Sequence, residues 1–129
     1  MRLLLDSHAL VWAVDDPSKL GSAAAAACND PSHVLEVSVA TVWELSIKHA
    51  LGKLLFTVPF RRWIEEAVSA LSIVLLPIRL EHIYHQTELP WHHRDPFDRL
   101  LVAQALVEDV PIVSADPVFD AYGVRRWWN

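Results

Sequence analysis

The sequence contains one cysteine, three glycines, no long apolar run and no excess of basic charge. Cys28 has no partner for an internal disulfide, so we expect a reducing, cytoplasmic setting. The clearest apolar run, Ile73 to Leu76, is far shorter than the roughly 20 residues that a membrane-spanning helix needs. The N-terminus has neither the basic start nor the apolar stretch of a signal peptide. These absences predict a soluble protein with no membrane partner.

The scarcity of glycine and of basic charge excludes two further classes. Three glycines supply neither a dinucleotide-binding fingerprint nor a phosphate-cradling loop, so nucleotide cofactors are not expected. A net charge of -5 argues against a general basic face for nucleic acid. Short basic clusters remain, and each is either a solvated surface group or a phosphate contact: Arg61-Arg62, His92-His93-Arg94 with Arg99, and Arg125-Arg126. Acidity therefore does not exclude a nucleic-acid substrate.

Apolar side chains are plentiful. They make up 53% of the 129 residues, against a usual share of about 45 to 50%, and six are tryptophan. A domain of this size should bury roughly two-thirds of its unfolded surface. The excess indicates either a dense core or an interface, with a homodimer as the default. Trp43, Trp63 and Trp91 are the side chains that we assign to such an interface.

Strand and helix patterns alternate along the chain. Strands are predicted over residues 1–5, 34–39, 73–76, 112–113 and 124–127, and helices over 8–14, 22–28, 41–51, 59–70, 80–89 and 96–108, with a helical turn at 116–117. Such alternation implies crossover connections and a mostly parallel sheet covered on both faces. We therefore expect one α/β domain over residues 1–129, with helix, sheet and helix layers.

Four acids stand where this order places a strand before a helix: Asp6, Glu44, Asp98 and Asp116. The carboxyl ends of parallel strands share one edge, so acids far apart in sequence can meet there. Neighbouring carboxylates raise one another's pKa unless a cation neutralises them. Mg²⁺ and Mn²⁺ favour carboxylate and water oxygens. The four acids together predict a site for one or two such ions.

Each acid also has a structural explanation. Asp6 and Asp116 are suited to cap helices, and Glu44 completes a Thr41-x-x-Glu44 capping box. Asp98, three residues after Asp95, favours the positive end of a helix dipole. Capping accounts for each acid singly. Metal binding accounts better for all four, because Ser, Thr and Asn cap equally well.

Bound divalent ions suit phosphodiester hydrolysis, since one activates water and a second, about 4 Å away, stabilises the leaving oxygen. No Ser/His/Asp or Cys/His arrangement offers a protein nucleophile. Two alternatives stay open: another metal-dependent phosphoesterase, such as a DNA nuclease or phosphatase, and a non-catalytic Mg²⁺-binding domain like a phosphorylation receiver. Zinc binding through His82-x-x-His85 and His92-His93 is disfavoured because no cysteine pair supports it.

Local motifs add a family resemblance from Leu3 to about Tyr122. They resemble the PIN-domain family, specifically VapC-type ribonuclease toxins of prokaryotic toxin-antitoxin pairs, in the segments LLLDSH at 3–8, VWELSIK at 42–48, LGKL at 51–54, HRDPFDRLLVAQA at 93–105 and IVSAD at 112–116. The resemblance implies a single PIN domain over residues 1–129. It also implies an endoribonuclease dependent on Mg²⁺ or Mn²⁺, a homodimer and inhibition by a cognate VapB-like antitoxin.

The resemblance carries the family's acidic quartet to Asp6, Glu44, Asp98 and Asp116. Five further residues are candidates for the surroundings of the metal or for substrate contact. Ser7 and Ser114 either orient a water or phosphate or bond locally to backbone. Lys48, one helical turn after Glu44, makes an ion pair worth about 0.3 to 0.5 kcal/mol or a phosphate contact. The others are Asp95, which otherwise caps the helix at Pro96, and Arg99; Asp120 is a fallback for the fourth acid.

Overall fold

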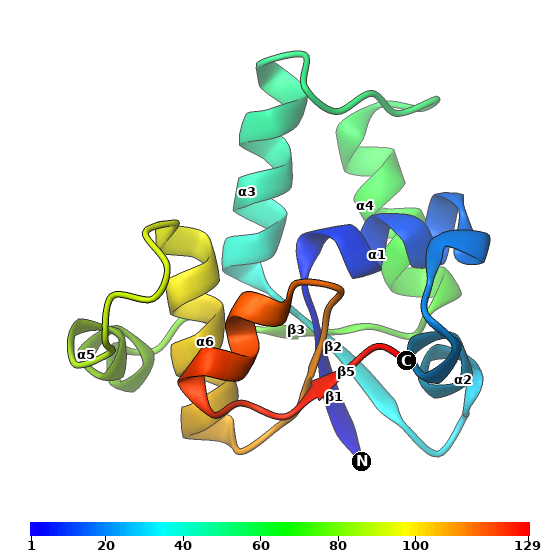
Figure 1. The fold of residues 1–129 in the computed structure, drawn as a ribbon. Coiled ribbons are helices and arrows are strands. Elements are labelled where there is room, and N and C mark those ends of the chain that lie inside the picture. Colours follow the sequence, from blue (N-terminus) through cyan, green and yellow to red (C-terminus); the bar gives the residue numbers. More distant parts are fainter.

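A five-stranded parallel sheet lies between two layers of helices in the computed structural model, which describes residues 1–129 (Figure 1). The strands are β1 (Arg2–Leu5), β2 (Val34–Ser38), β3 (Val74–Leu76), β4 (Ile112–Val113) and β5 (Arg126–Trp127), in the order β3-β2-β1-β4-β5. The helices are α1 (Ser7–Asp15), α2 (Ser22–Asn29), α3 (Val39–Ala50), α4 (Phe60–Ala70), α5 (Leu80–Thr87) and α6 (Pro96–Glu108), with short 3₁₀ helices η1 (Pro17–Lys19) and η2 (Pro117–Tyr122). The predicted fold class is confirmed.

The start of α3 corrects one detail of the sequence analysis. Ser38, the last residue of β2, is the N-cap of α3, and its hydroxyl accepts a hydrogen bond from the Ala40 N–H at 3.1 Å. The predicted capping box is therefore wrong, because Thr41 and Glu44 both lie inside the helix. Gly52, which follows α3, has a left-handed conformation, with φ of 72°.

Side chains of β1 alternate between two hydrophobic clusters. Leu3 and Leu5 point to the cluster formed with α1, α2, α3 and α4, whereas Leu4 points to the cluster formed with α6 and η2. All three leucines are fully buried. This alternation fixes the register of the central strand, since a shift by one residue would reverse every contact. The central strand therefore holds both helical layers in place.

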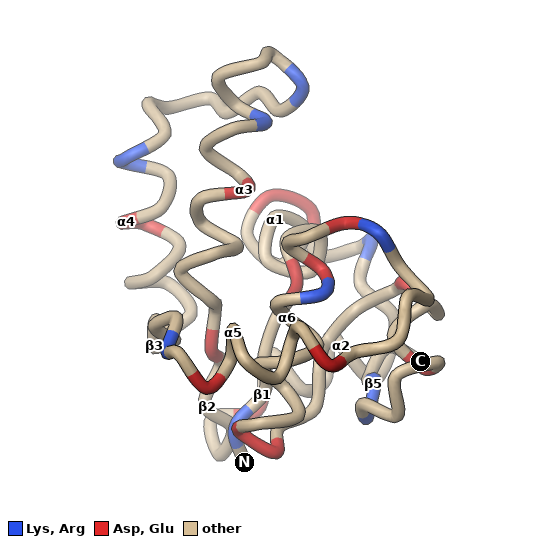
Figure 2. The backbone as a smooth tube through the Cα atoms, turned by 90° about the vertical axis from the view of Figure 1, so that its left-hand side faces the viewer, with Lys and Arg blue, Asp and Glu red and all other residues tan.

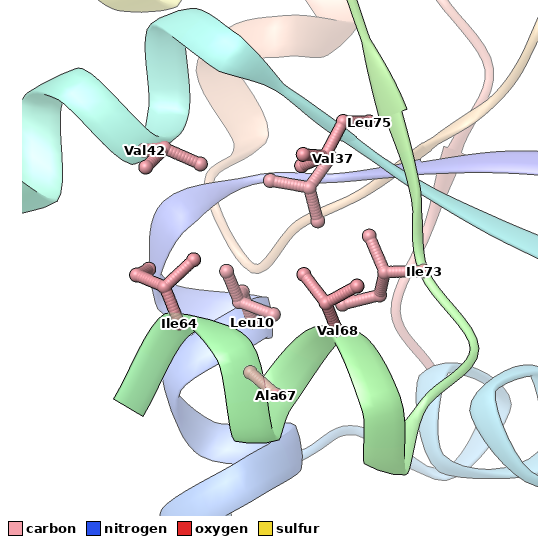
Figure 3. Close-up of a pocket in the computed structure, with 8 residues that line it drawn as sticks. All are labelled: Leu10, Val37, Val42, Ile64, Ala67, Val68, Ile73 and Leu75. Atoms are coloured by element: carbon pink, nitrogen blue, oxygen red, sulfur yellow. The ribbon is translucent and has the colours of Figure 1, made fainter. Parts of the chain in front are cut away.

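α4 packs tightly against the sheet and leaves only a small gap. Eight apolar side chains enclose a cavity of only about 10 Å³, and Figure 3 shows them converging from α1, α3, α4, β2 and the β3 segment. So small and apolar a space offers no polar partner for a water molecule. It is a packing gap and not a ligand site.

A network of ion pairs lies at the amino edge of the sheet. The buried carboxylate of Glu36, on β2, accepts from the Arg2 guanidinium at 3.0 Å. Glu108, at the end of α6, accepts from Arg2 at 3.0 Å and also contacts Arg79 and His82. These contacts raise the pKa of Arg2, with the hydrogen bond to Glu36 as the largest cause, and lower that of Glu108, chiefly through His82. Carboxylates at this edge are thus matched by cationic or donor groups.

Two of the three tryptophans assigned to an interface are exposed, and one is not. Trp43 and Trp91 are 61% and 74% exposed. Trp63 is only 3% exposed, and its indole N–H donates to Asp15 Oδ1 at 3.0 Å. The interface assignment of Trp63 is wrong, because the face of α4 that carries it packs onto the larger cluster.

None of the helices combines the length and the apolar character that crossing a bilayer requires.

Trp63→Ala is expected to lower the free energy of unfolding by about 3 to 5 kcal/mol, because it leaves a cavity in the core. Urea unfolding followed by circular dichroism measures this loss. Trp43→Ala is the matched control, since the same truncation at an exposed side chain removes much less buried surface. Equal losses for the two variants would contradict the core position of Trp63.

Candidate metal centre

The four predicted acids line one cavity at the carboxyl edge of the sheet. Its volume is about 140 Å³, and its lining residues are Asp6, Ser7, His8, Glu44, Lys48, Asp95, Asp98, Asp116 and Phe119. Figure 2 shows acidic segments gathered around α1, α3 and α6. Acids from four separate elements are therefore brought together, as we expected from the shared edge of parallel strands.

Asp6 and Asp116 reach the cavity directly from neighbouring strands. Asp6 follows β1 and caps α1, with Oδ1 accepting from the Ala9 N–H at 2.8 Å. Asp116 lies three residues after β4 and caps η2, with Oδ1 accepting from the Val118 N–H at 3.0 Å. Both capping roles proposed for these acids are present in the structure.

Glu44 and Asp98 reach the same cavity from helices. Glu44 lies in the second turn of α3, and Asp98 lies in the first turn of α6, which follows a loop. The expectation that every acid stands at a strand-to-helix transition is thus correct for only two of the four. Asp95 is the N-cap of α6 and accepts from the N–H groups of Phe97 at 2.8 Å and Asp98 at 3.2 Å.

Negative charge is crowded in this cavity. Five carboxyl groups line it, and Lys48, whose Nζ lies 3.2 Å from Glu44 Oε2, is the only lysine or arginine that does so. Burial, followed by the neighbouring charges of Asp95 and Glu44, raises the pKa of Asp98 to about 7 against an opposing effect of His93. Burial also raises the pKa of Asp6, against the lowering effect of a hydrogen bond with Ser114. The positive charge in the cavity therefore compensates only part of its negative charge.

His93 belongs to the site, although the sequence left it as either a solvated surface group or a phosphate contact. Its Nε2 lies 2.8 Å from Asp98 Oδ2. Ligand atoms of His93, Asp98 and Asp116 all lie within 4.8 Å of one another. No sequence spacing marked His93, because it lies in a loop without regular structure. Its place as the first residue of the motif at 93–105 was the one available signal.

The remaining candidates divide into two groups. Ser7 and Lys48 line the cavity, and the buried Ser114 hydroxyl accepts from the Asp116 N–H at 3.0 Å. Asp120 lies outside it in an ion pair with Arg126 at 3.0 Å.

Arg99 requires a correction, because it is buried away from the cavity. Its guanidinium donates to the carbonyl oxygens of Pro90 at 2.9 Å, Gln86 at 3.0 Å and Leu89 at 3.2 Å. Its Cζ atom also lies 3.8 Å from the centroid of the Trp91 ring. These bonds engage both terminal nitrogens of the guanidinium, while the buried Nε has no hydrogen-bond partner. Arg99 therefore supports the loop and does not contact substrate.

The donor set fits a hard divalent cation. Carboxylate oxygens are the ligands that Mg²⁺ and Mn²⁺ prefer, and this cavity offers more of them than its cationic side chains neutralise. Burial is the largest cause of the raised pKa values of Asp6 and Asp98, and neighbouring acids add to it. A bound divalent ion would neutralise the excess carboxylate charge.

Comparison with known proteins places this acid-lined α/β domain in a family. The PIN-domain family model matches residues 3–124, so the chain belongs to the PIN-domain family. PIN domains are generally nucleases and generally use divalent metal ions. Among curated proteins, no sequence gives a significant match.

Solved structures with the same fold include VapBC2 from Rickettsia felis bound to a DNA fragment from its promoter. That likeness has a TM-score of 0.73 at 13% identity and covers 98% of this chain and 99% of the other. FitAcB from Neisseria gonorrhoeae gives 0.65 at 17% identity, with 96% and 95% covered. FitAB bound to the IR36 DNA fragment gives 0.64 at 15%, with 96% and 92% covered. At such identities the likeness establishes the fold.

In the metal-free protein, the free energy of unfolding is expected to fall as pH rises from about 4 to 7. Asp98 keeps its proton in the folded state up to a pKa of about 7, whereas the unfolded chain releases it near 3.8. Between these values the folded state binds more protons, so this group contributes a falling slope of up to about 1.4 kcal/mol per pH unit. Urea unfolding from pH 4 to 8 measures it.

Two variants isolate the contribution of Asp98 to this slope. Asp98→Asn should make the decline shallower, because the titrating carboxyl is gone. Glu66→Gln, at an exposed position of α4, should retain the wild-type slope. A slope that Asp98→Asn leaves unchanged would contradict the raised pKa.

Proposed function

We propose that this chain is a divalent-metal-dependent endoribonuclease and the toxin of a VapBC-type toxin-antitoxin system. The observation that carries the proposal is the meeting of Asp6, Glu44, Asp98 and Asp116 in one cavity of a PIN domain. The structural likeness to VapBC2 and FitAB supports the toxin assignment, since those proteins are toxin-antitoxin complexes.

In this proposal the four acids hold Mg²⁺ or Mn²⁺. Bound ions would supply an activated water and would stabilise the charge that develops on the leaving oxygen of a phosphodiester. Lys48 presents its ammonium on the cavity wall, where it can bind a phosphate oxygen while its ion pair holds Glu44 in place. The hydroxyl of Ser7, on the same wall, offers a donor to the phosphate or to water.

The alternatives differ in substrate or in chemistry. A DNA nuclease would use the same acids on DNA, and a phosphatase would release phosphate from monoesters. A receiver-like domain would form a stable phosphoaspartate and cleave nothing. Membership of a nuclease family weighs against the receiver-like alternative. RNA, DNA and a phosphomonoester therefore belong in the same assay.

Purified protein freed of any inhibitor is expected to cleave RNA with Mg²⁺ or Mn²⁺ and to stop in EDTA. Asp6→Asn and Asp98→Asn should each lower the rate by about 100-fold or more, the scale for groups acting at the reaction centre, while the chain stays folded. Asp109→Asn is the matched control, since its side chain is 94% exposed at the far end of α6. Undiminished cleavage by both cavity variants would remove these acids from catalysis.

We also propose that exposed apolar side chains contact partner proteins. Trp43, Trp91, Leu55 and Leu80 are each more than 60% exposed, and large exposed apolar groups commonly mark interfaces. A second copy of the chain and a VapB-like antitoxin are the proposed occupants. Aromatic side chains supply much of the affinity at such surfaces. A basic antitoxin side chain would also meet the five carboxyl groups of the cavity and compete there with the metal.

Light scattering on the isolated chain at micromolar concentration is expected to give twice the chain mass of 14.6 kDa. Co-expression with a small neighbouring reading frame should yield a larger complex that no longer cleaves RNA. A monomeric mass would contradict the homodimer. A neighbouring product that neither co-purifies nor suppresses cleavage would contradict the toxin assignment.

A further inference from the structure

We propose that His93 is a positioning residue that orients the Asp98 carboxylate by donating a hydrogen bond from Nε2, and that it is not itself a metal ligand. This inference rests on the proposed function, because it takes Asp98 to hold the metal. It concerns a side chain outside the acidic quartet, on a loop whose path is fixed by contacts with α6 and η2.

The hydrogen bonds of the imidazole decide which nitrogen carries the proton. The Asp95 N–H donates to His93 Nδ1 at 3.2 Å. A ring nitrogen that accepts a hydrogen bond carries no proton, so in this arrangement the single ring proton is on Nε2. Nε2 lies 2.8 Å from Asp98 Oδ2 and therefore donates to it. A metal ligand needs a free lone pair, which Nε2 lacks here.

Proximity alone would suggest the opposite role. His93, Asp98 and Asp116 place ligand atoms within 4.8 Å of one another, as a three-ligand metal site would. Binding a metal through Nε2 would require the proton to move to Nδ1. That proton would then face the Asp95 N–H, so the hydrogen bond between them would be lost. The local backbone thus favours His93 as a donor.

The same arrangement occurs at the opposite edge of the sheet. His82 accepts from the Arg79 N–H through Nδ1 at 3.0 Å, and its Nε2 lies 2.9 Å from Glu108 Oε2. Glu108 is also bound by two arginines, so this histidine holds a carboxylate within a structural network. Two histidines in one chain therefore hold carboxylates in the same way, and only one of these carboxylates lines the acidic cavity.

Contacts with the rest of the fold keep the loop around His93 in place. Tyr122 Oη accepts from the His93 N–H at 2.8 Å. Arg99 holds the preceding segment through the three carbonyl oxygens of Gln86, Leu89 and Pro90. Arg99 follows Asp98 directly on α6, so the helix that carries the acid also anchors the loop that carries its donor. The buried Arg99 thus supports the site without touching it.

A hydrogen bond to Oδ2 fixes the rotation of the Asp98 carboxylate and leaves Oδ1 outside this contact. Groups that orient metal-binding side chains in this way typically change metal affinity by about 10- to 100-fold when they are removed. The expected effect of losing the His93 donor is therefore a weaker metal site in a folded protein.

Two substitutions separate the two hydrogen bonds of the ring. The amide nitrogen of glutamine stands near the position of Nε2, so His93→Gln keeps a donor for Asp98. The amide of asparagine stands near Nδ1, so His93→Asn keeps an acceptor for the Asp95 N–H but cannot reach Asp98. Calorimetric titration with Mn²⁺ is expected to show affinity about 10- to 100-fold weaker for His93→Asn and close to wild type for His93→Gln. His33→Asn, at the amino edge of β2, is the matched control and should bind Mn²⁺ like wild type.

Spectroscopy on the wild-type protein provides readouts that do not depend on activity. Nitrogen NMR of the metal-free chain should show the His93 proton on Nε2, and pulsed electron paramagnetic resonance of the Mn²⁺-loaded chain should show no directly coordinated nitrogen. A coordinated nitrogen, a proton on Nδ1, or equal Mn²⁺ affinity for His93→Asn and wild type would overturn the inference alone. Failure of the wild-type chain to bind Mn²⁺ would instead overturn the proposed function, and the inference with it.

Discussion

The parallel alignment of three central strands is the constraint on which the site depends. Leu5 of β1 pairs with Val113 of β4, and the Asp6 N–H donates to the Val113 carbonyl at 3.2 Å. This register fixes where Asp6 and the segment leading to Asp116 leave the sheet. On the other side of β1, β2 runs straight into α3 and brings Glu44 to the same edge. Backbone pairing, and not attraction between the side chains, therefore brings three of the four acids together, and α6 adds Asp98.

The two edges of the sheet differ in how far the charge of their carboxylates is compensated. At the amino edge, Glu36 and Glu108 are surrounded by donors, and the pKa of Glu108 is lowered by His82 and Arg2. At the carboxyl edge, burial and neighbouring acids raise the pKa of Asp98, with one lysine on the cavity wall. Positive charge thus compensates the carboxylates at the amino edge but only part of those where the acids meet. An incompletely compensated site of this kind is typical of function and not of stability.

Sequence reasoning predicted most of the fold because local signals agreed with the tertiary arrangement. Asp95 and Pro96 mark the start of α6, and the uninterrupted run Leu3-Leu4-Leu5 suits a strand buried on both faces. The signal failed where two local patterns competed, as at α3, where both Ser38 and Thr41 suit an N-cap. Sequence patterns also gave no signal where a contact depends on the three-dimensional course of a loop. His93 reaches Asp98 only because Arg99 and Tyr122 hold its loop, and no spacing in the sequence encodes that path.

Capping and metal binding, weighed as alternatives for each acid in the sequence, are compatible in the structure. Asp6 and Asp116 each use Oδ1 to accept from a backbone N–H at the start of a helix. A carboxylate has two oxygens and about four lone-pair positions, so a cap leaves capacity for another ligand. The hydrogen bond also fixes the orientation of the group in advance, which reduces what an incoming ion must order. Helix capping at this edge is therefore compatible with the proposed cation, because it orients these carboxylates and leaves them capacity for a further ligand.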